Sequence, residues 1–129
     1  MGQSIEARCL DCGGTDFDVS HGGGMTFHLL RCDRCGETKR VSFFDLGLIH
    51  LRYVKGLSVP YCIASRERDR FIQEELDIEP LAEEDYFREV EAFAGSCPCG
   101  GSFTFDAPPR CPYCHSTRLV ECGGALMYD

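Results

Sequence analysis

Four cysteines near the start of the chain have the spacing of a metal site. They form two Cys-x2-Cys pairs separated by nineteen residues: Cys9, Cys12, Cys32 and Cys35. Two such pairs with roughly 15 to 20 residues between them are typical of a tetrahedral zinc site, because thiolate sulfur is a preferred zinc ligand. A glycine follows each pair, and glycine allows the turn to bend so that backbone N–H groups point at sulfur. The spacing predicts one zinc ion held by these four side chains.

A second set of cysteines lies near the other end of the chain. Its pairs are separated by eleven residues, and its members are Cys97, Cys99, Cys111 and Cys114. The first pair is Cys-x-Cys, so its turn is tighter than the others. If Cys97 or Cys99 does not bind metal, His115 or Cys122 could complete the four ligands. We expect a second zinc ion here, and two in the whole chain.

The ten cysteines in 129 residues could instead form disulfides. No apolar leader follows Met1, and no run of eighteen apolar residues occurs, so neither secretion nor a membrane span is expected. A reducing cytoplasm is therefore the predicted location, and Cys-x2-Cys pairs usually hold metal there.

The net charge of −8 comes from the middle of the chain. Residues 67 to 91 hold eleven acidic residues and three arginines, which is the whole net charge. A zinc ion with four thiolates adds about −2 for each site. A polyanion would be repelled by the molecule as a whole.

Short alternating segments predict strands beside the first cysteine set. Alternation over residues 16 to 19 and 25 to 29, around the glycine-rich segment 20–24, predicts a β-hairpin. A third strand is expected over 39–44. The core of such a unit is too small to offset chain entropy, so metal binding and folding should be coupled.

The middle of the chain predicts helices. Asp45 could cap a short helix over 46–51, and the apolar stretch 46–57 exceeds what a small metal-bound unit can bury. That stretch should be shared core or a docking surface. Ser65 is expected to cap a helix over 66–76, and a second helix should run from near Pro80 to Gly95. Its acidic face is either solvated or a docking surface for a basic partner.

The cysteine turns resemble the zinc-ribbon, or rubredoxin-like, superfamily. The resemblance rests on Arg8-Cys9-Leu10-Asp11-Cys12-Gly13, Arg31-Cys32-Asp33-Arg34-Cys35-Gly36 and Arg110-Cys111-Pro112-Tyr113-Cys114. It covers the two cysteine-containing segments and leaves out the helices, and it implies a zinc ribbon over 1–44 and a second ribbon over 96–129. Together with the expected linker and acidic helical segment over 45–95, this predicts an α+β protein. Members include transcription factors, ribosomal proteins, redox carriers and enzyme subunits, so the resemblance implies metal binding more than one function.

Two alternatives follow from the same residues. Cys111-Pro112-Tyr113-Cys114 is similar to a rubredoxin turn, which would imply iron and electron transfer, but the ligand loops are shorter and His115 replaces glycine. The basic residues 31, 34, 39 and 40, with Phe43 and Phe44 nearby, could bind nucleic acid. The acidic middle segment opposes that interpretation.

Few other residues suggest chemistry. His21 and His28 lie at the predicted hairpin tip, His50 suits a core position, and Cys62 is expected to be packed rather than reactive. Four thiolates leave zinc no open position for substrate, and no phosphate loop or catalytic triad is recognisable. No catalytic residue is predicted.

The sequence thus favours a zinc-binding accessory or adaptor protein. Its zinc ions would be structural, and its partner would be another protein or a complex. That complex could be an enzyme, of which this protein would be a non-catalytic subunit. A nucleic-acid-binding regulator is the alternative, and membrane binding is not expected.

Overall fold

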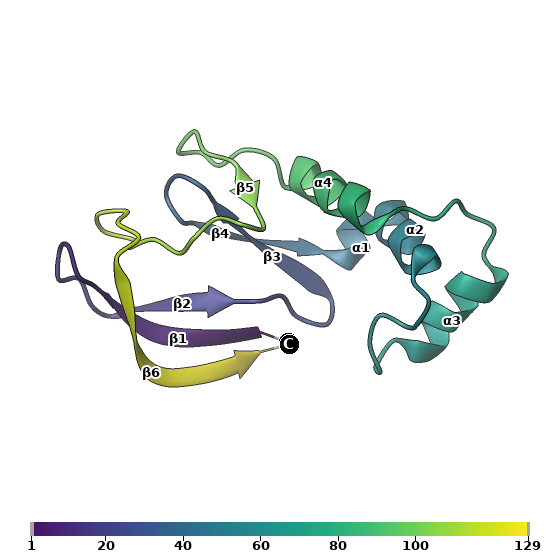
Figure 1. Ribbon diagram of the computed structural model, residues 1–129, viewed down its shortest axis with the longest axis horizontal. Coiled ribbons are helices and arrows are strands. Elements are labelled where there is room, and N and C mark those ends of the chain that lie inside the picture. The colour runs from purple at the N-terminus through teal and green to yellow at the C-terminus, as the bar shows by residue number, and fades with distance from the viewer. Residues whose placement is uncertain (1, 129) are drawn as a thin grey trace.

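The computed structural model describes residues 2–128 and has strands at one end and helices at the other (Figure 1). The α+β class is therefore confirmed. Two three-stranded antiparallel sheets form the strand end. We call them sheet A, with the order β2-β1-β6, and sheet B, with the order β4-β3-β5.

Sheet A contains β1 (Gly2–Cys9), β2 (Phe17–His21) and β6 (Leu119–Tyr128). The central strand β1 alternates Ile5, Ala7 and Cys9 with polar residues, and Ala7 and Cys9 are buried. No strand was predicted over these residues from the sequence. Because β1 pairs with both neighbours, it joins the two ends of the chain.

Sheet B contains β3 (Phe27–Cys32), β4 (Thr38–Ser42) and the short β5 (Phe103–Thr104). The predicted hairpin over residues 16 to 29 is wrong, since β2 and β3 lie in different sheets and residues 22–26 cross between them. Alternation identified both strands, but alternation does not determine which strand is the partner. The strand expected over 39–44 corresponds to β4, except that Phe43 and Phe44 begin helix α1 (Phe43–Leu46).

Four helices form the other end of the molecule and lie between β4 and β5 in the sequence. They are α1 (Phe43–Leu46), α2 (Leu48–Gly56), α3 (Arg66–Glu75) and α4 (Glu83–Ala94). The helix expected over 46–51 corresponds to α2, but its N-cap is Gly47 and not Asp45, which lies within α1. Ser42 caps α1, because its hydroxyl accepts a hydrogen bond from the Asp45 backbone N–H at 3.0 Å. Gly47 has a φ of 56° and separates α1 from α2. Gly95 caps the C-terminal end of α4, as predicted, but the helix begins three residues after Pro80.

The main hydrophobic core lies between sheet B and helices α2 and α4. Its buried members are Leu30, Cys32, Val41, Phe43, Leu46, Tyr53, Tyr86, Val90, Ala94, Cys97 and Phe103. The rings of Tyr53 and Tyr86 stack at 3.9 Å between centroids and couple α2 to α4. The apolar stretch 46–57 therefore supplies core in part. Within residues 2–128, no helix has the length and apolar character needed to span a membrane.

Candidate metal centres

All eight cysteines of the two predicted sets fall into two groups of four, but the grouping differs from the prediction. Centre A is Cys9, Cys12, Cys111 and Cys114, and centre B is Cys32, Cys35, Cys97 and Cys99. Within each group the sulfur atoms all lie within 4.8 Å of one another. The expected pairing of the first two turns with each other is therefore wrong. Each centre takes one turn from each end of the chain.

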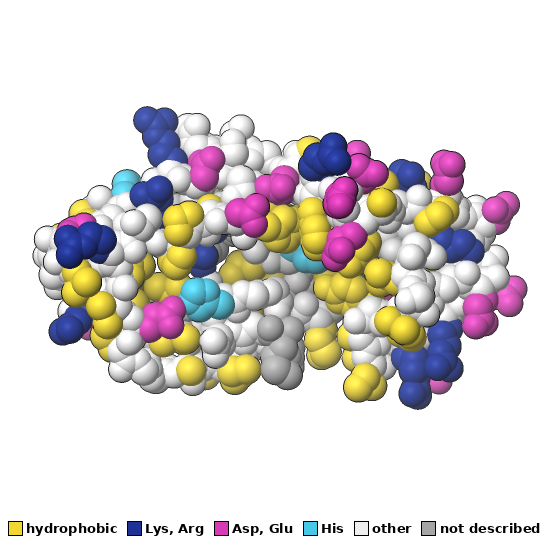
Figure 2. Space-filling model, in the orientation of Figure 1, with side chains coloured by type: hydrophobic (Ala, Val, Ile, Leu, Met, Phe, Trp, Pro, Cys, Tyr) yellow, Lys and Arg dark blue, Asp and Glu magenta, His cyan; other side chains and the backbone are white. Residues whose placement is uncertain are grey.

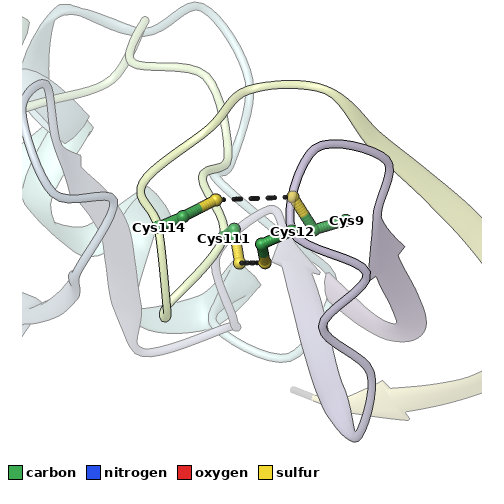
Figure 3. A group of neighbouring side chains, drawn as sticks. All are labelled: Cys9, Cys12, Cys111 and Cys114. Carbon is green, nitrogen blue, oxygen red and sulfur yellow. Dashed lines mark hydrogen bonds between the residues drawn. The ribbon is translucent and has the colours of Figure 1, made fainter.

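Centre A lies at the end of sheet A, and its four side chains converge on one point (Figure 3). The Sγ atoms of Cys9 and Cys114 are 3.6 Å apart, as are those of Cys12 and Cys111. Cys9 and Cys111 are buried, whereas Cys12 and Cys114 are exposed. The buried pair therefore lies toward the protein interior, and the exposed pair lies toward solvent.

Centre B has similar spacing in a more enclosed setting. The Sγ atoms of Cys32 and Cys99 are 3.4 Å apart, and those of Cys35 and Cys97 are 3.6 Å apart. Cys32 and Cys97 belong to the main core, and Cys35 packs against it. A tetrahedron of zinc–sulfur bonds of about 2.3 Å has sulfur–sulfur edges of about 3.8 Å, so both groups fit a metal ion of this kind.

Strand pairing explains why the turns at 9–12 and 32–35 do not pair with each other. In sheet A, Cys9 pairs with Leu119, which draws the turn at 111–114 toward the turn at 9–12. In sheet B, Cys32 pairs with Phe103, which places the turn at 97–99 against the turn at 32–35. Sequence proximity favours local pairing only weakly, because the entropy of loop closure grows slowly with length. The three-part division of the chain stays a prediction, but each sheet combines strands from its first and last parts.

Two aspartates strengthen these junctions. Asp11 accepts hydrogen bonds from the Arg118 guanidinium at 2.6 Å and from the Ser116 hydroxyl, both on the segment that leads into β6. Asp33 accepts one from the Ser102 backbone N–H at 3.0 Å. Each turn from the first half of the chain thus holds its partner by polar contacts in addition to the cysteines.

Backbone N–H groups point at the sulfur atoms, as the glycines after the cysteine pairs suggested. Gly14 and Tyr113 donate to Cys12 and Cys111 at 3.4 Å in centre A. In centre B, Arg34 donates to Cys32 at 3.4 Å. Such bonds favour the thiolate over the thiol, because they stabilise negative charge on sulfur.

All four cysteine turns share one backbone conformation. The residue after each cysteine pair has a left-handed φ: Gly13, Gly36, Gly100 and His115, at 72°, 81°, 98° and 65°. In three turns its N–H donates to the carbonyl of the first cysteine four residues earlier, and in the tighter Cys97 turn Gly100 donates three residues back. His115 therefore occupies the position that glycine holds elsewhere. The shorter turn at 97–99 still contributes both of its cysteines to centre B.

The thiols of one group cannot all ionise without a cation. The backbone N–H of Cys12 lowers the pKa of Cys9 to about 7. Burial would raise the pKa of Cys32, but the backbone N–H groups of Cys35 and Arg34 outweigh it and lower that pKa to about 6. Although the backbone N–H of Cys99 acts the other way, burial and the neighbouring thiols raise the pKa of Cys97 to about 12. A bound divalent cation removes this conflict and favours four thiolates.

The alternative ligands lie elsewhere. His115 and Cys122 belong to neither group, and the exposed Cys122 thiol donates to the Val120 carbonyl at 3.5 Å. Each group could hold one metal ion, consistent with two zinc sites. The role of the eight cysteines as ligands, and zinc rather than iron, stay predictions.

The other residues with possible chemistry are spread over the molecule. His50 is a core residue, as predicted, and only 2% of its surface is exposed. His28 is not at a hairpin tip but in β3, where its Nε2 lies 2.7 Å from the Tyr86 hydroxyl. His21 ends β2 and lies 2.6 Å from Glu121 of β6. Cys62 is half-buried beside Ser65.

No curated protein and no solved structure matches this chain. One family model does, and it covers residues 5–120, which include both four-cysteine groups and all four helices. The chain therefore belongs to the family described as a domain of unknown function, DUF8255.

Proposed function

We propose that this protein is a zinc-stabilised adaptor that binds another protein through its helical end, while its two zinc ions have a structural role. The observation that carries the proposal is the contrast between closed metal centres and a helical segment with exposed large apolar side chains. Each half of this contrast supports a different part of the proposal.

The cysteine groups favour a structural metal. Four sulfur atoms complete a tetrahedron, so a zinc ion in either centre would have no free position for water or substrate. The turns also join segments distant in the sequence, which is what a structural cross-link does. The described residues around the centres offer no acid–base pair beside an open coordination site.

The helical segment favours a protein partner. Six of its large apolar side chains are exposed: Phe44, Leu48, Val59, Ile63, Phe71 and Phe93. Ile63 is 89% exposed, on the loop before α3. Figure 2 shows hydrophobic side chains between the strand end and the helical end, with acidic side chains along the upper edge and on the helices. Apolar side chains rimmed by charge are typical of protein interfaces.

The basic cluster supports the nucleic-acid alternative less than the sequence suggested. Arg31 donates to the Ser20 carbonyl, and Lys39 donates to the Ala94 carbonyl at 2.7 Å. The Arg40 guanidinium lies 4.7 Å from the centre of the Phe27 ring. These contacts occupy side chains that phosphate binding would need, and Phe43 is buried. We therefore rank nucleic-acid binding below protein binding.

The proposal is tested by photo-crosslinking in native cells. A photoreactive residue at Ile63 should capture one protein, whereas the same residue at Leu126, an exposed apolar position on β6, should not. With the captured partner purified, Ile63→Glu should weaken binding at least about tenfold, as for a central interface residue, and Leu126→Glu should have little effect. Equal crosslinking at both positions would contradict the proposal. So would a salt-dependent shift on DNA or RNA with no protein partner.

A further inference from the structure

A groove of about 810 Å³ opens between the first two helices and the loop before α3. We propose that this groove binds a small aliphatic monocarboxylic acid, with the chain against its apolar walls and the carboxylate between His50 and Arg68. Its volume is within the range of roughly 300 to 1,000 Å³ common for ligand pockets. The proposal does not rest on the adaptor role, although Phe44 belongs both to this groove and to the exposed apolar side chains of the helical segment.

The walls of the groove are mainly hydrophobic. Phe43, Phe44 and Leu51 come from α1 and α2, and Met25 comes from the segment before β3. Phe44 is 93% exposed, so its ring stands at the mouth without internal packing. An alkyl chain would cover surfaces that now face water, and each buried methylene contributes about 0.8 kcal/mol.

His50 supplies an unsatisfied polar atom in this apolar setting. Its ring stacks on Phe43 with 4.0 Å between centroids, and its Nδ1 lies 2.8 Å from the Tyr86 hydroxyl. The Nε2 is buried and has no hydrogen-bond partner among the described residues. A buried unpaired donor or acceptor is destabilising, so a ligand group that pairs with Nε2 would be favoured.

The chain of hydrogen bonds behind His50 can make Nε2 a donor. The Tyr86 hydroxyl lies between His50 Nδ1 and His28 Nε2, and it can donate to one ring while accepting from the other. If His28 donates to Tyr86 and Tyr86 donates to His50 Nδ1, then Nε2 carries the proton and donates to a carboxylate. Burial lowers the pKa of His28 and of His50 to about 4, so both rings are neutral at pH 7. The Tyr86 hydroxyl and both ring nitrogens of His50 then have partners.

Arg68 determines the charge of the ligand. It is the one Lys, Arg, Asp or Glu among the described residues that line the groove. Its guanidinium makes one long contact, 3.4 Å to Asp69 Oδ1, while the buried Asp69 carboxylate also accepts from the Tyr61 N–H and the Ser65 hydroxyl. One positively charged arginine and one neutral histidine together match a ligand that carries a single negative charge. The net charge of −8 disfavours a dianion.

The test uses the full-length, zinc-loaded protein and decanoate below its micelle-forming concentration. Decanol, which has the same chain and no charge, is the matched ligand. Titration followed by NMR should give decanoate an affinity about tenfold higher, since a charged hydrogen-bonded group is worth about one factor of ten. The His50 ring nitrogen signals should shift with decanoate. Equal affinity for the two ligands, or no binding by decanoate, would overturn the proposal.

A pair of arginine variants locates the carboxylate. Arg68→Gln should weaken decanoate binding about tenfold and change decanol binding less than about twofold. Arg70→Gln, on the same helix but not lining the groove, should leave both unchanged. Because Arg68 is largely exposed, its replacement should not prevent folding. Equal effects of the two variants would contradict binding in the groove.

Cys62 provides an independent readout, because its side chain lines the groove and belongs to neither metal centre. Decanoate should slow alkylation of Cys62 and not that of Cys122, which is exposed on β6. Peptide mass spectrometry distinguishes the two thiols. Protection of neither thiol, or of both equally, would place the ligand outside the groove.

Discussion

The two metal centres share a ligand set and differ in their surroundings. Centre B is part of the main core, since Cys32 and Cys97 are buried among residues from sheet B and the helices. Centre A holds sheet A, whose buried hydrophobic residues are few: Ala7, Cys9 and Val19. A metal at centre B would reinforce an existing core. A metal at centre A would take the place of a core, as in small domains that fold only with metal.

Replacing the first, buried cysteine of each centre tests this difference most strongly. Cys32→Ser should abolish cooperative folding, because it opens the main core as well as a metal site. Cys9→Ser should release sheet A but leave the helical half folded. Structural zinc sites contribute on the order of 10 kcal/mol, so both effects should be large. NMR spectra and elemental analysis measure them, with close to two zinc per wild-type chain and one in Cys9→Ser.

Identical unfolding of both variants would contradict the asymmetry between the centres. A coloured wild-type protein with iron would contradict the assignment of zinc. A single metal equivalent in the wild type would mean that one group does not bind metal.

Removal of one buried hydroxyl probes the half that contains centre B. Tyr86→Phe leaves His28 and His50 without their shared partner and should lower the free energy of unfolding by about 2 kcal/mol. Hydrogen exchange should accelerate in β3, α2 and α4. Exchange in β1 and β6 should be unchanged, and equal acceleration there would mean that the molecule opens as one unit.

Alanine at equivalent turn glycines compares the two centres directly. At Gly13 a Cβ would meet no atom within 4 Å, so Gly13→Ala should cost only the left-handed backbone, about 1 kcal/mol. At Gly36 the Cβ would lie 2.7 Å from Arg110 Cβ, so Gly36→Ala should cost more, about 2 to 3 kcal/mol. Chemical denaturation at fixed zinc measures both. A larger effect at Gly13 would contradict the geometry.

His115 offers the smallest expected effect and the opposite sign. Its φ of 65° is strained for histidine, so His115→Gly should stabilise centre A by about 0.5 to 1 kcal/mol. Zinc competition with a chelator measures the gain. In the corresponding turn of centre B this position is already a glycine, Gly100, so Gly100→His should weaken that centre. Loss of zinc affinity in His115→Gly would indicate another role for the ring.

The sequence predicted the local features well and the long-range ones poorly. The involvement of these eight cysteines in four-cysteine groups, the cap of α4 at Gly95 and the core position of His50 followed from spacing, capping and hydrophobicity. The grouping of the cysteines did not, because it depends on β1 pairing with β6, a contact between the two ends of the chain. Ile5, Ala7 and Cys9 carried an alternation that could have revealed β1. The partner of that strand had no local signal.

The exchanged pairing of the turns also orders events during synthesis. Residues 9–12 and 32–35 emerge from the ribosome early, but each must wait for a partner between residues 97 and 114. Until then the chain carries two half-sites with two sulfur atoms each. Neither group of four can therefore be complete before Cys99 has been made, and centre A waits until Cys114. A chain interrupted between Cys99 and Cys111 would have all four cysteines of centre B but only half of centre A.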